Sequence, residues 1–283
     1  MPRTNERRMK AKDLNDERGR AGKVRHIKLI LGYDGTNFEG WQIQPKGRTV
    51  QGEVERSLEV LHKQKTPVLC AGRTDSGVHA RGQVVSFFSP LDSIPVHLYP
   101  KALNSVLPKD IAVRSAELVS EEFHPRYDAR KRTYFYYLDP RASRDISQDR
   151  YSWQLGRMPN VQRLNQYAQA IVGTHDFTTF SAVNPQMPNP VRTIFTSAFY
   201  PKGPLLVYEI TGMSFLWRMV RSLVGSMVYY DQKNFPSDRM VDYLQRADRS
   251  LCGPTAPAQG LFLHHISYGT DHFPVAPGGM NNV

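Results

Sequence analysis

The sequence predicts an α+β fold in which helices pack against an antiparallel β-sheet. Strand-type runs rich in β-branched and aromatic residues alternate with amphipathic helical segments between residues 26 and 118, in the order β, α, β, loop, β, α, β. That order is typical of the split βαβ or ferredoxin-like pattern. In the second half, Pro-Lys-Gly-Pro at residues 201–204 separates two further strand-like runs, as in a hairpin. The 283 residues are enough for one large domain or two ordinary ones.

The first half supplies a definite set of expected elements. Strand-type runs occupy residues 26–33, 67–70, 84–88 and 111–118, and helical periodicity occupies residues 49–63 and 95–107. In the first helix, apolar residues recur at spacings of four, four and three from Val50 to Leu61. In the second, Leu98, Ala102 and Val106 share one face. Each helix therefore has one apolar side that can pack on a sheet.

The second half repeats this mixture. Helices are expected at residues 161–172, 215–230 and 236–247, strands at 191–194 and 205–211, a last strand within 255–263, and a loop at 141–157. The segment 215–230 is apolar almost all round, which is typical of a buried helix. At the other extreme, residues 1–23 are charged and almost free of apolar side chains, so we expect a disordered basic tail.

Composition limits the function classes. Thirty-seven Lys and Arg against 26 Asp and Glu give a net charge of +11, which indicates a polyanionic partner such as nucleic acid or an anionic membrane. No apolar run is long enough for a membrane span, and the N-terminus does not resemble a signal peptide. Cys70 and Cys252 have neither metal-ligand spacing nor framework partners, so we expect a reduced, cytoplasmic protein. His264 and His265 also lack partners at metal spacing, and no metal site is expected.

One loop concentrates the candidate chemistry. Residues 71–83 lie between two strand-type runs and hold three glycines, two arginines, a histidine and a single carboxylate, Asp75. A carboxylate at a strand end, next to cations and with little side-chain bulk around it, suits a nucleophile or base that meets a large substrate. The alternative is that Asp75 caps a turn and Arg73 pairs with a surface acid.

Arg218 and Arg221 interrupt the apolar segment 215–230. They are three residues apart and are therefore neighbours on a helix surface. A buried arginine stays charged and needs a partner. We hypothesise that Arg221 pairs with Asp75 and holds that carboxylate ionised and oriented. The alternative is a structural ion pair with another acid.

Three further stretches have two interpretations each. Phe38 and Trp41 either stack on RNA or pack in the core. The basic residues at 126–132, followed by Tyr134 and Tyr136 on one strand face, suit either RNA binding or a half-buried strand with a charged entry. The pair at residues 175–176, His-Asp, is assigned a structural or RNA-contact role rather than a catalytic one, because adjacent residues on a turn rarely face each other.

The string Gly-Arg-Thr-Asp-x-Gly-Val-His-Ala-x-Gly-Gln-Val at residues 72–84 resembles the signature of the TruA family of tRNA pseudouridine synthases. Further blocks resemble the same family in order, over roughly residues 26–268: 33–42, 123–136, 173–180, 215–225 and 255–263. The chain departs from the family pattern at four positions: it has Ser76 for the usual Ala, Trp217 for Tyr, Arg218 for His and Ser222 for Asn.

The resemblance implies both a fold and an assembly. It implies two ferredoxin-like (RRM-like) α/β sandwich domains whose antiparallel sheets join, with the active-site cleft between them, in a homodimer. The domains would be residues 24–128, which carry the catalytic loop, and 129–270, followed by a loose tail at 271–283.

The resemblance also implies a reaction and a set of site residues. It implies a tRNA pseudouridine synthase that acts on uridines 38 to 40 in the anticodon arm, without a cofactor or a metal. Asp75 would be the essential aspartate, with Arg73 binding substrate beside it and Arg221 next to its carboxylate. Tyr134 would contact the target base, and Leu261 would belong to the wall of the base pocket. The reaction does not decide whether Asp75 is a nucleophile or a base.

Two alternatives to this reading follow from the residues alone. A non-catalytic RRM-like RNA-binding protein explains the charge and the aromatic residues, but it does not explain a buried arginine that pairs with a loop aspartate. The sequence also lacks the RNP1-type string. A hydrolase with Asp75 as nucleophile usually needs a second carboxylate, which the Asp75 loop does not offer.

Overall fold

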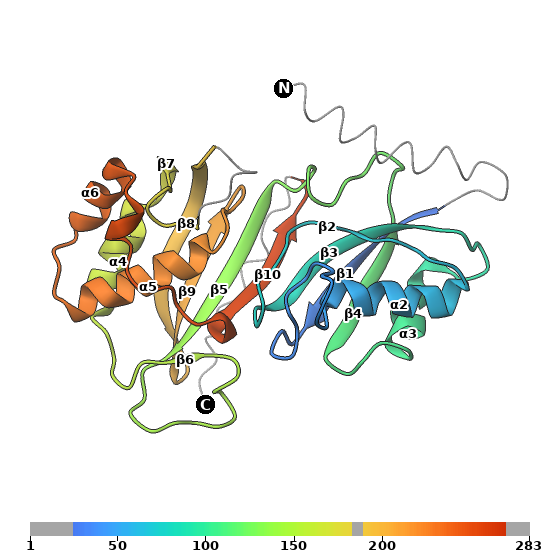
Figure 1. Cartoon of the computed structure of the whole chain (residues 1–283), viewed down its shortest axis with the longest axis horizontal. Helices are drawn as coiled ribbons and strands as arrows, with labels where there is room; N and C mark the ends of the chain where they lie inside the picture. Colours follow the sequence, from blue (N-terminus) through green and yellow to red (C-terminus); the bar gives the residue numbers. More distant parts are fainter. Residues whose placement is uncertain (1–24, 183–188, 270–283) are drawn as a thin grey trace, which may run out of the picture.

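The computed structural model describes residues 25–182 and 189–269 as a mixed α/β protein built on one large, mostly antiparallel sheet (Figure 1). The two predicted tails, residues 1–23 and 271–283, lie outside the described residues. The sheet contains ten strands: β1 (Arg25–Tyr33), β2 (Leu69–Cys70), β3 (His79–Ser89), β4 (Ile111–Leu118), β5 (Lys131–Asp139), β6 (Trp153–Gln154), β7 (Gly173–Asp176), β8 (Val191–Lys202), β9 (Leu205–Gly212) and β10 (Leu261–Ser267). Five α-helices accompany it: α2 (Val50–His62), α3 (Tyr99–Asn104), α4 (Val161–Ala170), α5 (Met219–Gln232) and α6 (Arg239–Arg246).

The strand order is β4-β1-β3-β10-β5-β9-β8-β7, with β2 paired to β3 and β6 paired to β5. Strands from the first half of the chain therefore form one side of the sheet, and strands from the second half form the other. The last strand, β10, lies between them: it runs parallel to β3 and antiparallel to β5 (Figure 1). Through β10 the two halves of the chain form a continuous sheet.

The helices pack on one face of this sheet. In β1, alternate residues Ile27, Leu29 and Leu31 are fully buried in the same hydrophobic core as the inner residues of α2 to α6. In β5 the residues on this face are Tyr134 and Tyr136, as their spacing predicted. The opposite face carries only a small apolar cluster of described residues, centred on Tyr137, Val207 and Phe262.

Most of the expected elements are present, and the differences have local causes. The predicted helix at residues 95–107 is divided into a 3₁₀ turn, Val96–Leu98, and the short α3. Its buried residues are Tyr99 and Leu103, whereas Leu98 and Val106 are exposed, so the predicted apolar face was wrong. Pro100 occupies the first turn of α3, where a proline is tolerated and fixes a helix start.

The predicted helix at residues 215–230 begins later than expected. α5 starts at Met219 because Arg218, its N-cap, has a left-handed backbone conformation with φ 59°. A residue in that conformation cannot continue a right-handed helix. The predicted hairpin is confirmed: β8 and β9 pair in antiparallel register from Lys202 and Leu205 onward. No helix within residues 25–182 and 189–269 has both the length and the apolar composition that a membrane span requires.

The C-terminus of α2 provides a test of the backbone geometry. Lys63 caps this helix with φ 58°, and its backbone N–H donates to the carbonyl of Glu59. A left-handed conformation costs a non-glycine residue about 1–2 kcal/mol, and replacement by glycine removes this cost. Glycine in turn loses about 0.5–1 kcal/mol more chain entropy on folding, which offsets part of the benefit. Lys63→Gly should therefore raise the free energy of unfolding in urea by about 0.5–1 kcal/mol. Lys65→Gly is the matched control, because Lys65 is equally exposed without a positive φ, and it should not stabilise the protein. Equal changes in the free energy of unfolding for the two variants would contradict the left-handed conformation of Lys63.

Candidate active site

The Asp75 loop and helix α5 meet through an ion pair. Asp75 Oδ2 lies 3.2 Å from Nη1 of Arg221, and the side chains are 24% and 14% exposed. Nε of the same guanidinium donates to the carbonyl of Ala256 at 2.8 Å, and the N–H of Ala256 donates to the carbonyl of Arg221 at 3.1 Å. Arg221 is thus fixed on both sides. The hypothesis that it pairs with Asp75 is confirmed.

The other carboxylate oxygen of Asp75 also has a donor. Nε1 of Trp217 donates to Asp75 Oδ1 at 3.1 Å. Trp217 lies just before α5, is 47% exposed, and has the guanidinium carbon of Arg218 4.9 Å from its ring centroid. The sequence identified Trp217 only as a departure from a family pattern. The next residue, Arg218, has a left-handed backbone conformation, which sequence periodicity does not reveal.

The backbone of the loop is held by polar groups of the first half. The hydroxyl groups of Tyr33 and Thr74 are 2.9 Å apart, and the N–H of Trp41 donates to the carbonyl of Thr74 at 3.1 Å. Nε2 of the fully buried Gln83 donates to the carbonyl of Gly72 at 2.7 Å. Buried polar groups that are hydrogen-bonded in this way resist displacement, because breaking one bond leaves its partner unsatisfied. Asp75 therefore projects from a fixed loop.

The aromatic residues at 38–41 support this loop from below. Phe38 is 2% and Trp41 is 1% exposed, so the interpretation of these rings as an RNA-stacking surface was wrong and the core interpretation is confirmed. Gly40, between them, has φ +89°, and a Cβ at this position would lie 2.7 Å from the carbonyl oxygen of Thr74. Only glycine permits so close an approach of the two backbones.

Tyr134 lies on β5 and belongs to the main hydrophobic core. Its side chain is 8% exposed and packs edge-on against Phe215, with ring centroids 5.1 Å apart. Burial, with a smaller contribution from the negative charge of Asp75, raises the pKa of Tyr134 to about 12. The phenol is therefore neutral near pH 7 and able to donate a hydrogen bond.

Leu261 begins β10 on the same sheet face as Tyr134. It is 6% exposed and opposes Tyr136 in the sheet register. The turn just before it touches the Asp75 loop, since a Cβ on Gly77 would lie 3.1 Å from Cβ of Ala258. The structure thus brings Asp75 and Arg221 together. It puts Leu261 directly after the turn that contacts the Asp75 loop, on the same sheet face as Tyr134.

The basic residues near the site divide into two kinds. Arg132 is buried and donates to the carbonyls of Ala71, Arg126 and Met213 at 3.1, 2.8 and 2.6 Å. It is a structural residue, so for Arg132 the second of the two interpretations, a half-buried strand with a charged entry, is the one that the structure supports. Arg73, in contrast, is exposed and forms no ion pair or hydrogen bond with any residue in the described ranges. Its position next to the site is consistent with contact to a bound molecule.

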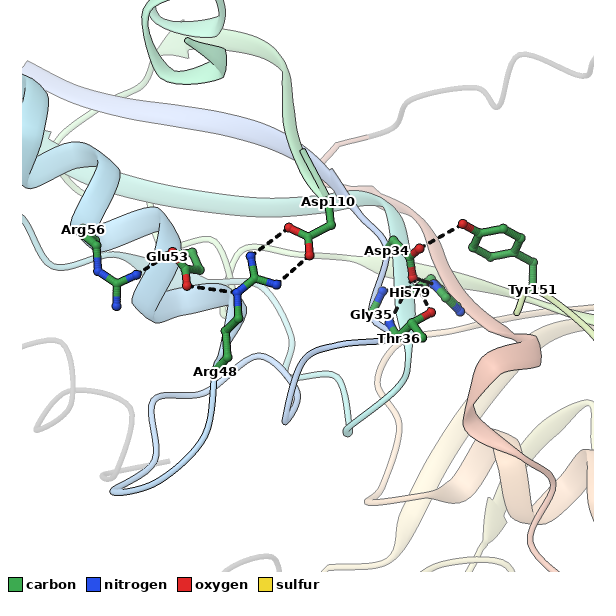
Figure 2. Close-up of polar contacts among 9 residues, drawn as sticks. All are labelled: Asp34, Gly35, Thr36, Arg48, Glu53, Arg56, His79, Asp110 and Tyr151. Atoms are coloured by element: carbon green, nitrogen blue, oxygen red, sulfur yellow. Dashed lines mark hydrogen bonds and ion pairs between the residues drawn. The ribbon is translucent and has the colours of Figure 1, made fainter. Parts of the chain in front are cut away.

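A second polar network anchors the end of the loop, at the start of β3 (Figure 2). His79 is fully buried; its Nδ1 accepts the N–H of Gly35 at 3.0 Å, and its Nε2 lies 3.1 Å from the carbonyl of Arg150. Because Nδ1 is an acceptor, the proton of a neutral ring is on Nε2. Asp34 Oδ1 is 3.2 Å from Nδ1, and Asp34 Oδ2 accepts the hydroxyl of Tyr151 at 2.9 Å. The network joins the loop at 141–157 to the first half of the chain.

Figure 2 also shows the ion pairs that hold the start of α2. Arg48 donates to both carboxylate oxygens of Asp110, at 2.6 and 2.9 Å, and to Glu53 at 3.1 Å. A two-point arginine–carboxylate contact fixes orientation as well as distance. It ties the segment that contains Gly40 to the start of β4.

Other residue patterns do not form a site. His175 and Asp176 lie on β7 at the sheet edge; Nε2 of His175 is 3.0 Å from the carbonyl of Val172, while Asp176 accepts the N–H of Thr178. They do not form a dyad. His264 stacks on Phe135, with ring centroids 4.0 Å apart. Within the described ranges, no group of three His, Cys, Asp or Glu side chains could hold a metal ion.

The other two positions at which the chain departs from the family pattern are Ser76 and Ser222. The hydroxyl of Ser76 donates to the carbonyl of Phe38 at 3.2 Å, so it reinforces the same contact between the loop and residues 38–41. Ser222 is fully buried in α5, and its hydroxyl has no hydrogen-bond partner among the described residues.

Comparison with known proteins gives a consistent picture. The chain matches the family model for tRNA pseudouridine synthase at residues 30–128 and 167–269. It is 41% identical over 244 residues to a Bacillus subtilis protein named tRNA pseudouridine synthase A, a match that covers 86% of this chain and 98% of the relative. A protein of the same name from Treponema denticola is 40% identical over 258 residues, covering 89% and 96%. One from Borrelia turicatae is 40% identical over 245 residues, covering 87% and 100%.

The first prediction from this geometry concerns Gly40, and Gly156 is its control. A Cβ at Gly156 would meet nothing within 4 Å, although this glycine also has a positive φ of 74°. Gly156→Ala should therefore lose only the cost of the backbone conformation, about 1–2 kcal/mol of unfolding free energy. Gly40→Ala carries an additional steric cost of about 1–3 kcal/mol against Thr74. Urea unfolding of both variants measures the difference, and equal losses would show that the close contact is absent.

The second prediction concerns pH. Burial lowers the pKa of His79, while the Asp34 carboxylate opposes this effect. As pH falls below about 6.5, the unfolded chain binds a proton at this residue before the folded protein does, so stability present above that pH is lost. His79→Asn keeps an acceptor for the N–H of Gly35 but does not titrate. The variant should be less stable at pH 7.5 and lose less unfolding free energy than the wild type between pH 7.5 and pH 5. A loss as large as that of the wild type would contradict the prediction.

Proposed function

This chain belongs to the tRNA pseudouridine synthase family and is an isomerase of that family, and we propose that it converts uridines 38, 39 and 40 of the tRNA anticodon arm to pseudouridine with Asp75 as the reacting carboxylate. The observation that carries the assignment of Asp75 is its ion pair with Arg221, which holds a single carboxylate at a fixed place. Both residues lie within the segments that match the family model.

The reaction is an isomerisation, so the atoms balance within one nucleotide. The bond between C1′ and N1 breaks, the uracil rotates, and C1′ bonds to C5. The hydrogen of C5 then leaves as a proton, and N1 takes up a proton. Asp75 either attacks the nucleotide and is later released, or removes a proton; in both cases it must be ionised at the start. The donors on its two oxygens are Arg221 and Trp217.

A uridine in a stem or loop must leave its stack before its C1′ and C5 can be reached. We assign reception of the extruded base to Tyr134, whose neutral hydroxyl can donate to a uracil oxygen and whose ring can lie against the base. We assign an apolar part of the pocket wall to Leu261, which is buried on the same sheet face. The exposed Arg73 lies where it can bind a phosphate of the flipped nucleotide.

The net charge of +11 suits a tRNA substrate, because phosphate contacts supply much of the affinity for nucleic acid. We propose that two ferredoxin-like halves, residues 24–128 and 129–270, form the cleft that admits the anticodon arm, with β10 joining their sheets. The two segments that match the family model fall on either side of this boundary. We further propose a homodimer that works in the cytoplasm, where tRNA is modified, without a cofactor.

Tritium release from tRNA labelled at C5 of uridine tests the reaction. Asp75→Asn should lower the rate at least about 1,000-fold while tRNA binding is retained, because the reacting carboxylate is lost and the shape of the side chain is kept. Asp242→Asn is the matched control: Asp242 lies on α6, 42% exposed and paired with Arg246, and its replacement should leave the rate unchanged.

The tRNA positions are tested separately, by mapping pseudouridine chemically in tRNAs that carry uridine at 38, 39 or 40 and elsewhere. Modification outside the anticodon arm would contradict the proposed specificity. Tight tRNA binding by the wild type without tritium release from any unmodified tRNA would instead favour a non-catalytic RNA-binding protein.

A further inference from the structure

Trp217 occupies a position at the site that the proposed function does not yet explain. Its indole N–H donates to Asp75 Oδ1 at 3.1 Å, while Arg221 is 3.2 Å from Oδ2. Each oxygen of the carboxylate therefore has its own donor, and rotation of the carboxylate about its terminal bond would break both contacts.

We propose that Trp217 is a positioning residue for Asp75, whose indole N–H holds Oδ1 so that the carboxylate faces the bound nucleotide in one orientation. This inference rests on the proposed function. It concerns a residue at which the chain departs from the family pattern, so it is a property of this chain's own site rather than of a shared motif.

The backbone on both sides of Trp217 is arranged to hold the ring there. Its carbonyl accepts the N–H of Ala182 at 3.0 Å, and the carbonyl of Leu216 accepts the N–H of Met219 at 3.2 Å. Arg218 then takes the left-handed conformation with φ 59°, which is uncommon for a residue with a side chain. Strained residues of this kind concentrate at functional sites, where the surrounding structure fixes them. Here the strained residue separates Trp217 from the helix.

The two donors act differently on the carboxylate. Arg221 lies in the first turn of α5 and supplies a full positive charge. The carbonyl of Ala256 anchors its guanidinium. Trp217 supplies a neutral dipole whose direction is set by the plane of a large ring, and the ring in turn has the Arg218 guanidinium 4.9 Å from its centroid. Loss of Trp217 would therefore leave the charge of Asp75 compensated but its orientation free.

Two substitutions separate the N–H from the rest of the ring. Trp217→Phe keeps an aromatic ring and removes the donor. Trp217→His restores a donor, because Nε2 of imidazole occupies the same place in its five-membered ring as Nε1 of indole. We expect Phe to lower kcat roughly 10-fold with KM for tRNA within about twofold, and His at pH 8 to recover most of that loss. Trp153→Phe is the matched control for the same chemical change and should leave both constants unchanged.

A raised KM with unchanged kcat in Trp217→Phe would overturn the proposal, because it would make Trp217 an RNA-stacking residue. Equal kcat values for the Phe and His variants, or a wild-type kcat in both, would overturn it as well.

The hydrogen bond itself is measured without catalysis. The chain has three tryptophans and should give three indole N–H cross-peaks in a ¹⁵N–¹H spectrum. The peak that disappears in Trp217→Phe should be the one that moves in Asp75→Asn, since the bond to a charged acceptor becomes a bond to a neutral one. If that peak does not move, the proposal fails. This spectrum remains informative if the wild type releases no tritium, so failure of the proposed function and failure of the positioning role are distinguishable.

Discussion

The ion pair between Asp75 and Arg221 joins the two halves of the chain at the candidate active site. The two residues are 146 positions apart in the chain, one in a loop after β2 and the other in the first turn of α5. Both side chains are largely covered, so each charge would be poorly solvated without the other. A loop from one half of the chain and a helix from the other must therefore be brought to within hydrogen-bond distance and kept there.

The strand β10 makes that meeting possible. It comes from the end of the chain, yet it lies between β3 and β5 and completes the sheet across the two halves. Gly82 of β3 approaches the carbonyl of His264 so closely that a Cβ there would be 2.4 Å from the oxygen. The hydroxyl of Tyr136 donates to the carbonyl of Pro257 at 2.8 Å and fixes the turn that precedes β10. The same stretch of chain supplies Ala256, which orients Arg221.

The polar groups around the site have separate tasks. Tyr33, Gln83 and Arg132 are buried and hydrogen-bonded to the loop backbone, so they hold its shape. Arg221 and Trp217 contact the carboxylate itself. Tyr134 is kept neutral by burial, and Arg73 is exposed. We propose that Tyr134 offers a hydrogen bond to a base and that Arg73 offers a charge to a phosphate. A base-modifying enzyme needs all three tasks, because it must hold its reacting group still, receive an extruded base and bind a polyanion.

The sequence alone predicts the α+β class, the strands around Asp75, the hairpin of β8 and β9, and the candidate site residues, because periodicity and a long motif are local properties. It also suggested the partner of Asp75, since a charged side chain in an apolar segment needs an acid. Three results required the folded structure: Phe38 and Trp41 are core residues, Arg132 binds carbonyls, and α5 begins at Met219 rather than four residues earlier. Those outcomes depend on contacts between segments far apart in the chain and on one left-handed residue, Arg218, which no local pattern encodes. The same reason explains why Trp217, which in the sequence is only a departure from the family pattern, donates a hydrogen bond to Asp75 in the folded protein.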